Sequence, residues 1–126
     1  MKNKKKFSLV LVKPSHYDDD GYVIQWFRSS MPANSLACLY GLAVECDKEK
    51  VLGKNIELKI HAFDEANTHI NTKKITSLIE SADDGMLMLV GVQSNQFPRS
   101  LDIAKPLRAM GIKVAVGGFH VSGVML

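Results

Sequence analysis

The sequence predicts an α/β fold, a three-layer, doubly wound parallel sheet of four strands in the spatial order 2-1-3-4. Two observations predict this class. Short apolar runs alternate along the 126 residues with longer segments of helical periodicity. In the second of these runs, apolar and polar residues alternate, which indicates a less protected face and therefore an edge strand. The first and third strands then lie side by side in the sheet, and right-handed crossovers place helices on both of its faces.

Four runs supply the strands. Residues 7–12 combine leucine with β-branched residues and end at Lys13-Pro14. The second run begins at Ile56 and alternates through residue 61. Residues 86–92 carry no charge, as expected of a strand covered on both faces, and residues 112–116 form the last run. After the first strand, a polar loop at 14–21 leads to an apolar stretch at 22–27, which is predicted to fold back onto the domain.

The first helix is expected to begin at Asn34 or Ser35, since either side chain can cap it, and to stop at Gly53. Helical spacing predicts its buried stripe as Leu36, Leu39, Tyr40, Ala43 and Val44.

The second helix is predicted over residues 68–82, with Asn71 or Thr72 as its cap. Its inward residues are predicted to be Ile75, Leu78, Ile79 and Ala82. The third helix starts at Pro98, which suits a first turn, and runs to Gly111. Pro106 inside it should bend the helix or divide it in two.

Composition excludes several classes of function. Hydrophobic residues make up 46% of the chain and charged residues 23%, as in a globular protein. The net charge is +3, but four lysines fall within the first six residues, and the remainder carries −1. We therefore predict a flexible basic tail at 1–6 and the domain at 7–126, with no nucleic-acid partner. No apolar run approaches a membrane span or a signal peptide, which predicts a cytoplasmic protein.

The two cysteines do not indicate a metal site. Cys38 and Cys46 lie eight residues apart in one predicted helix, too far for a shared metal within that helix and awkward for a disulfide. They are predicted to be reduced, small apolar residues.

The candidate site is the carboxyl edge of the sheet, where the winding reverses between the first and third strands. Loops at 13–21, 93–97 and 117–123 emerge there. The second loop brings amide and hydroxyl groups, and the two glycines of the third allow a close approach. Alone, that glycine pair is either a plain turn or a ligand contact; beside the other loops, contact is favoured. The candidate binding residues are Ser15, His16, Gln93, Ser94, Asn95, Gly117, Gly118 and His120.

Several familiar sites are absent from the sequence. The first strand is followed by Lys13-Pro14 where a dinucleotide fold would place spaced glycines. No nucleophilic triad is visible, and a phosphoacceptor domain would need acidic residues where Gln93-Ser94 follow the third strand. His16, beside three aspartates, is either a metal or acid–base residue or part of a solvated loop. The residues are therefore suited to binding, and no catalytic or metal-ligating residue is assigned.

The end of the chain suggests a fragment. Residues 124–126 are apolar and directly follow a glycine-rich loop. We expect a further helix and a fifth strand to have been left off, so that the fourth strand is an edge on which a second copy can pair.

Three segments resemble a known family: VKPSHYDDDGY at 12–22, GVQSNQFPR at 91–99 and GGFHVSG at 117–123. Together they are similar to the N-terminal cobalamin-binding-type domain of radical S-adenosylmethionine (radical SAM) proteins, over essentially the whole chain. The resemblance implies a flavodoxin-like, Rossmann-like domain that caps or feeds a downstream barrel, which carries S-adenosylmethionine and a 4Fe-4S iron–sulfur cluster. It also implies that Gly117-Gly118 let the nucleotide tail of cobalamin pass and that Ser94 contacts it.

Two departures from the family limit the expected function. Many such domains have Asp-x-His-x-x-Gly after the first strand, whereas here Pro14 lies two residues before His16 and Gly21 five residues after it. The three-cysteine cluster motif is also absent, so the fragment performs no radical chemistry itself. We expect an accessory domain of a radical SAM enzyme that binds cobalamin. The alternatives are a structural or substrate-access domain that has lost cobalamin, or a free-standing small-molecule binding module.

Overall fold

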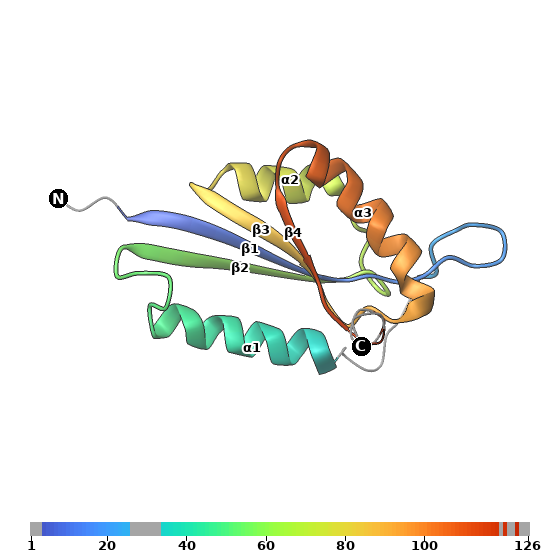
Figure 1. Cartoon of the computed structure of the whole chain (residues 1–126), viewed down its shortest axis with the longest axis horizontal. Coiled ribbons are helices and arrows are strands. Elements are labelled where there is room, and N and C mark those ends of the chain that lie inside the picture. The colour runs from blue at the N-terminus through green and yellow to red at the C-terminus, as the bar shows by residue number, and fades with distance from the viewer. Residues whose placement is uncertain (1–3, 26–33, 119, 121–122, 124–126) are drawn as a thin grey trace.

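The structure, a computed structural model, is a four-stranded parallel sheet with helices on both faces (Figure 1). It describes residues 4–25, 34–118, 120 and 123. The elements in chain order are β1 (Lys5–Lys13), α1 (Asn34–Lys48), β2 (Ile56–Asp64), α2 (Thr72–Glu80), β3 (Asp84–Leu89), the 3₁₀ turn η1 (Ser94–Gln96), α3 (Phe97–Ala109) and β4 (Lys113–Val116). The spatial order β2-β1-β3-β4 confirms the predicted fold class and strand order.

β1 is one of the two interior strands of the sheet, and its pairings are the longest. It pairs with β2 along all nine of its residues, from Lys5 opposite Ile56 to Lys13 opposite Asp64. It pairs with the six-residue β3 on its other side. β4 has four residues, all paired with β3. Within the described chain, β2 and β4 are therefore the two edges, and β2 is an edge as predicted.

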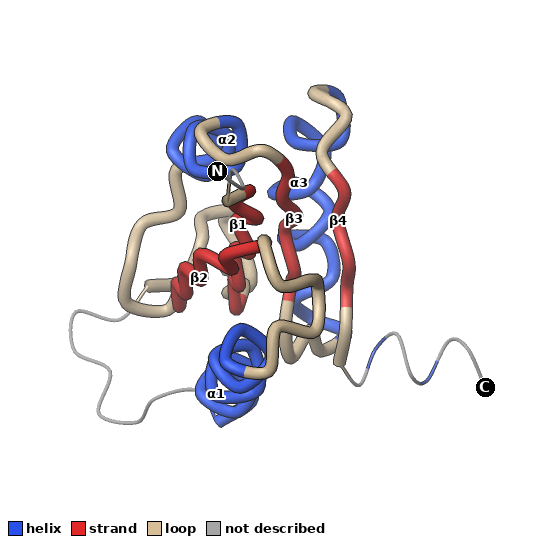
Figure 2. Tube along the Cα trace, turned by 90° about the vertical axis from the view of Figure 1, so that its left-hand side faces the viewer, coloured by secondary structure: helices blue, strands red, loops and turns tan. Residues whose placement is uncertain are grey.

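The two faces of the sheet are covered differently. α2 and α3 lie on one face and α1 on the other (Figure 2). Alternation along β1 sends Val10 and Val12 toward the α2–α3 face, and Leu9 and Leu11 toward α1. The buried core on the α2–α3 face comprises Val10, Val12, Ile70, Ile75, Ile79, Leu87, Leu89, Val92, Ile103, Ala104, Leu107 and Ile112. The buried residues of the α1 face are only Leu9, Leu11, Ala43 and Val90.

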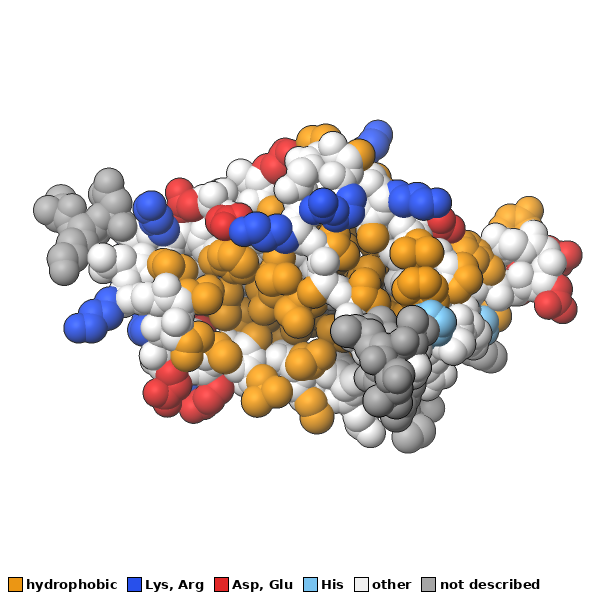
Figure 3. Space-filling view, in the orientation of Figure 1, with side chains coloured by type: hydrophobic (Ala, Val, Ile, Leu, Met, Phe, Trp, Pro, Cys, Tyr) orange, Lys and Arg blue, Asp and Glu red, His pale blue; other side chains and the backbone are white. Residues whose placement is uncertain are grey.

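α1 packs chiefly against β1 and β2, which leaves the α1 side of β3 and β4 less covered. Figure 3 shows apolar side chains gathered across the middle of the molecule, between α1 and α3. This difference between the faces leaves room for a cavity beside β4.

α1 departs from its predicted stripe. Ala43 is buried and Leu36 and Leu39 are partly buried, but Tyr40 is 44% exposed. The stripe is narrower than predicted because α1 covers only part of the sheet. The predicted stop at Gly53 is also wrong, since the helix ends at Lys48.

Both cysteines lie on exposed parts of α1 and are free thiols. Free thiols agree with the prediction that both cysteines are reduced. A surface position on the helix explains why neither contributes to the core.

α2 is shorter than predicted, although its cap is confirmed. Asn71 Oδ1 accepts hydrogen bonds from the backbone N–H of Lys73 (3.0 Å) and Lys74 (3.3 Å). The start at residue 68 is wrong because Asp64 holds that segment in a turn, its carbonyl accepting from the N–H of Asn67 and Thr68. Ile75 and Ile79 are buried and Leu78 is partly buried; Ala82, also partly buried, lies beyond the helix end.

α3 continues without interruption from Phe97 to Ala109 although Pro106 lies inside it. Division into two helices is therefore wrong. Pro106 is exposed, and buried Ile103 and Leu107 hold the helix against the sheet on either side of it. That packing outweighs the loss of one helical hydrogen bond.

The ends of the observed strands differ from the predicted ends by a few residues. β1 begins at Lys5, so Lys5 and Lys6 belong to the sheet and not to a tail. The Lys6 N–H donates to Asp83 Oδ2 at 2.6 Å. β3 ends at Leu89, three residues before its predicted end. None of the described helices is both long and apolar enough to cross a membrane.

The apolar stretch after the first loop is described only as far as Gln25. Tyr17 and Val23 form an antiparallel bridge, and Gln25 Nε2 donates to the carbonyls of Glu65 and Thr68, both at 3.2 Å. The loop therefore folds back as predicted, but Tyr22 at its tip is 73% exposed and not packed onto the domain. Residues 26–27 lie outside the described part of the chain.

Candidate ligand-binding site

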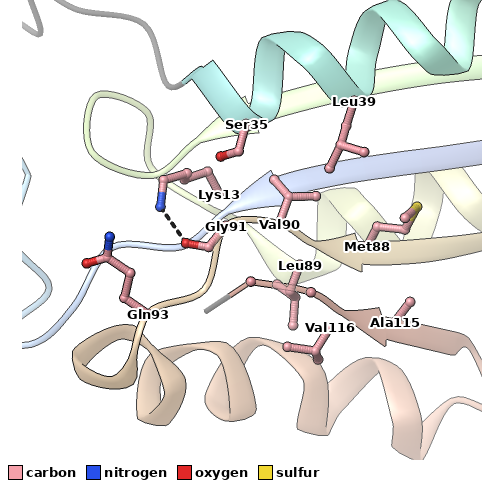
Figure 4. A pocket seen from close by; sticks show the side chains of 12 residues that line it. Lys13, Ser35, Leu39, Met88, Leu89, Val90, Gly91, Gln93, Ala115 and Val116 are labelled. Atoms are coloured by element: carbon pink, nitrogen blue, oxygen red, sulfur yellow. Dashed lines mark hydrogen bonds between the residues drawn. The ribbon is translucent and has the colours of Figure 1, made fainter. Parts of the chain in front are cut away.

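A cavity of about 580 Å³ opens at the carboxyl ends of β1, β3 and β4, on the α1 face of the sheet (Figure 4). Its lining residues are Lys13, Ser35, Leu39, Met88, Leu89, Val90, Gly91, Gln93, Ala115, Val116, Gly117 and Gly118. This is the predicted edge, where the winding reverses between β1 and β3. The volume lies within the roughly 300–1,000 Å³ typical of small-molecule sites.

Strand alternation builds the floor of the cavity. Leu87 and Leu89 of β3 enter the α2–α3 core, so Met88 between them faces the α1 side. Ala115 lies next to it on β4 and, being small, leaves space above the strand. α1 contributes Ser35 and Leu39 to the lining. The floor and this wall are thus mostly apolar.

Two glycines allow the loops around the cavity to approach each other. Gly91 has φ +62°, and a Cβ there would lie 2.5 Å from Ser35 Oγ at the start of α1. Gly118 has φ +140°, and a Cβ there would lie 2.3 Å from the backbone nitrogen of Val92. The Val92 N–H donates to the Gly117 carbonyl at 2.9 Å, which joins the two loops. A Cβ on Gly117, in contrast, would meet nothing within 4 Å.

Lys13 ends β1 at the cavity. Its Nζ donates to the Gly91 carbonyl (2.9 Å) and to Gln96 Oε1 (3.3 Å). Gln96 Oε1 also accepts from the Gln93 N–H at 2.9 Å, so the lysine is tied to the loop after β3. Burial lowers the pKa of the Lys13 ammonium, while the charge of Asp64 acts in the opposite direction.

The structure gathers part of the predicted site around this cavity. Gln93, Gly117 and Gly118 line it. Ser94 follows Gln93 directly, and its Oγ lies 3.1 Å from Nδ1 of His120. Asn95 is exposed in η1.

His120 also packs on Phe97, with 4.3 Å between the ring centroids. His120 is thereby held against the start of α3. His120 and Ser94 together form a polar contact next to the cavity and not part of its lining.

Ser15 and His16 do not line the cavity. Ser15 is buried; its N–H donates to Glu65 Oε1 (3.1 Å) and its hydroxyl to the Ile24 carbonyl (2.5 Å). His16 is half-buried, and its carbonyl accepts from the Ile24 N–H at 2.9 Å. Among the described residues, no group of three or more His, Cys, Asp or Glu side chains could hold a metal ion.

An ion pair that the sequence did not predict lies at the same edge. Glu65, after β2, is only 1% exposed, and its carboxylate accepts from Arg99 Nε (3.0 and 3.1 Å) and Nη2 (2.6 Å). Arg99 Nη1 also donates to the Tyr17 hydroxyl at 3.3 Å, and that hydroxyl donates to Asp102. We call these four residues the acidic–basic network.

The acidic–basic network joins the loop after β1, the end of β2 and the start of α3. Its hydrogen bonds to Glu65 raise the pKa of Arg99 further above its usual value. Burial, followed by the hydrogen bond to Asp102, raises the pKa of Tyr17. The convergence of parallel strand ends could have drawn attention to Tyr17 and Glu65. Nothing in the sequence selects Arg99 as their partner.

Fold and cavity together define a doubly wound α/β domain with a small-molecule-sized cavity where its winding reverses. Comparison of the chain with protein-family models, with curated proteins and with solved structures finds no match.

Proposed function

We propose that this chain is the cobalamin-binding-type domain of a cytoplasmic radical SAM protein that contains an iron–sulfur cluster. The observation that carries the proposal is the cavity at the carboxyl edge, bordered by Gly117 and Gly118. The three segments that resemble the family, at 12–22, 91–99 and 117–123, follow β1, β3 and β4 in the sequence, and the carboxyl ends of these strands form this edge. The role proposed for the domain is binding and not catalysis.

The lining residues suit the nucleotide tail of cobalamin, which combines a flat aromatic base with a polar sugar phosphate. Met88 and Ala115 give the base an apolar floor, and Gln93 offers an amide at the rim. Gly117 leaves open space where any side chain would project. When bound, cobalamin supplies a redox-active cobalt centre, and the residues of the chain hold and orient it. His16, which lies outside the lining, is not assigned to the cobalt.

The proposal extends to a partner in the same protein, a downstream radical SAM barrel that holds S-adenosylmethionine and a 4Fe-4S cluster. Its test is the reading frame beyond residue 126. A Cys-x-x-x-Cys-x-x-Cys motif there supports the attachment, and its absence from the frame contradicts it.

A second candidate is a structural or substrate-access domain without cobalamin. The position of His16 outside the cavity favours it, since no histidine is among the described lining residues of the proposed cofactor site. The two candidates differ in one measurable property, the uptake of cobalamin.

That property is tested by titrating the protein with hydroxocobalamin and following visible absorption and equilibrium dialysis. We expect saturable binding, and we expect Ala115→Leu to weaken it by about tenfold or more because the added atoms fill the cavity. Ala62→Leu, at an exposed position of β2, is the matched control and should bind as the wild type does. No binding by the wild type at saturating ligand overturns the cobalamin proposal.

A further inference from the structure

The mostly apolar lining of the cavity includes one positively charged side chain, that of Lys13. Lys13 is the one charged residue among its described lining residues; the others are apolar or neutral. Figure 4 shows its Nζ directed toward Gly91 at one end of the cavity, with Met88 and Ala115 farther along the floor. A ligand filling this space would therefore meet an apolar surface along most of its length and a cation at one end.

The known partners of Lys13 are neutral. Its ammonium group has three N–H donors, and two of them meet the Gly91 carbonyl and the Gln96 amide oxygen. In the described part of the chain, no carboxylate lies within the 4.0 Å of an ion pair with Nζ. One donor and the full positive charge remain for another group.

The nearby carboxylates are engaged elsewhere. Asp64 lies opposite Lys13 in the sheet register, but its Oδ1 accepts from the Ala66 N–H at 3.0 Å. Glu65 is bound by Arg99 through three contacts. The lowered pKa of Lys13 agrees with this geometry, because burial opposes the charge more than Asp64 supports it. A bound anion would reverse that balance.

α1 adds to the positive potential at this end of the cavity. The helix begins at Asn34, and Ser35 in its first turn lines the cavity. The amino end of a helix favours negative charge. This contribution supports the lysine and would not by itself define a site.

We infer that the cavity selects ligands in which an apolar body carries an anionic group, and that Lys13 recognises the anion. The inference deepens the proposed function, because the phosphodiester of the nucleotide tail of cobalamin is such an anionic group. Only the part of the inference that concerns cobalamin rests on the proposed function. Lys13 is thus a specificity-determining residue of the cavity.

The test uses two fluorescent probes that differ in charge. Anilinonaphthalene sulfonate is an apolar anion, and phenylnaphthylamine has the same aromatic rings without the sulfonate. Lys13→Met should lower the affinity for the sulfonate probe by about tenfold or more, which is the effect of losing a charged hydrogen bond. The affinity for the neutral probe should change by less than about twofold. Lys13→Arg should retain most of the sulfonate binding. Lys54→Met, at an exposed lysine before β2, should change neither affinity.

Two further variants separate the anion contact from other effects. Ala115→Leu must reduce binding of both probes, which places them in the cavity. Gln96→Leu removes an amide partner of Lys13 but keeps its charge, so the sulfonate probe should bind it as it binds the wild type. An equal loss with Gln96→Leu and Lys13→Met would mean that the lysine only holds the loop, and it would overturn the inference. Equal losses of affinity for the two probes with Lys13→Met would also overturn the inference.

The cobalamin arm compares hydroxocobalamin with cobinamide, which lacks the nucleotide and its phosphate. Lys13→Met should lower the affinity for cobalamin and leave the affinity for cobinamide unchanged. If the wild type binds the sulfonate probe through Lys13 but not cobalamin, the proposed function fails and the inference stands. If cobalamin binds and Lys13→Met changes no affinity, the inference fails and the proposed function stands.

Discussion

Two cations at the carboxyl edge of the sheet, Arg99 and Lys13, have opposite surroundings. Arg99 meets Glu65, a carboxylate that is 1% exposed, through hydrogen bonds of 2.6 to 3.1 Å. Within the part of the chain that the structure describes, Lys13 meets only a carbonyl and an amide oxygen. The pKa of Arg99 is accordingly raised and that of Lys13 lowered. Arg99 is thus paired directly with a carboxylate, whereas among the described residues no carboxylate lies within ion-pair distance of Lys13.

Under the proposed function, this difference gives the acidic–basic network a structural role and the cavity a binding role. The acidic–basic network holds three segments of the chain together, and the charge of Arg99 is already matched by that of Glu65. A ligand would have to compete with those bonds. At the cavity, by contrast, an anion would gain the charge of Lys13 without displacing a carboxylate. The side with fewer polar residues is therefore the better ligand site.

The largest predicted effect comes from breaking the buried pair. Glu65→Ala leaves Arg99 without its carboxylate and should lower the free energy of unfolding by about 3–5 kcal/mol, as loss of one partner from a buried ion pair does. Urea denaturation measures it.

The matched control is Asp84→Ala, which breaks the exposed Asp84–Lys113 pair (3.7 Å) and should change stability little. A double variant, Glu65→Leu with Arg99→Met, should recover part of the loss because no lone charge remains. If Glu65→Ala and Asp84→Ala have equal effects, the acidic–basic network does not stabilise the fold.

An intermediate effect is expected where the cavity loops meet. Gly118→Ala would place a Cβ against Val92 at a φ of +140° and should cost about 1–3 kcal/mol of stability. Gly117→Ala has open space and is the control, with an expected change under about 0.5 kcal/mol. Thermal and urea unfolding of both variants checks this prediction. Equal losses would show that the close approach to Val92 is not needed.

The smallest effect is the pH dependence contributed by Lys13. Its folded pKa lies below 10.5, so between the two values the unfolded chain binds more protons. Stability from this group therefore rises with pH across that window, by less than about 1 kcal/mol because the side chain is half-buried. Lys13→Met should abolish the rise.

The measurement is the difference between the urea midpoints of wild type and Lys13→Met, followed from neutral pH to about pH 11. Subtraction is needed because Tyr17 gives the opposite slope. Its pKa is raised, so its contribution is lost as pH increases above 10.0. A flat difference across the alkaline range would contradict a lowered pKa of the half-buried Lys13 ammonium.

Sequence patterns were sufficient for the strand order because one strand differed from the rest. Alternation at Ile56, Leu58 and Ile60 marked β2 as an edge, and the sheet has that order. The same order placed the loops containing Gln93 and Gly117 at one edge, where both line the cavity. These predictions depend on local periodicity and on the connection rules for parallel sheets, which allow only a few orders of the strands.

Features that depend on distant partners were not predictable. Glu65 and Arg99 both appear as surface charges in the sequence, and their pairing depends on how α3 is placed. Tyr40 lies at helical spacing with Leu36, but periodicity gives the direction of a face and not the width of the sheet beneath it. Pro106 similarly remains within a helix because neighbouring side chains are buried. In each case, tertiary packing overrode a local rule.

The unequal strand pairings also determine where the sheet opens most easily. β1 is paired along nine residues with β2, whereas β4 is held by four residues at an edge. Local opening is easiest where backbone bonds are few, so we expect amide protons to exchange sooner in β4 than in β1. β4 carries Ala115, part of the cavity floor. An occupied cavity would therefore slow hydrogen exchange in the least protected strand, and binding would be registered as local order in the sheet.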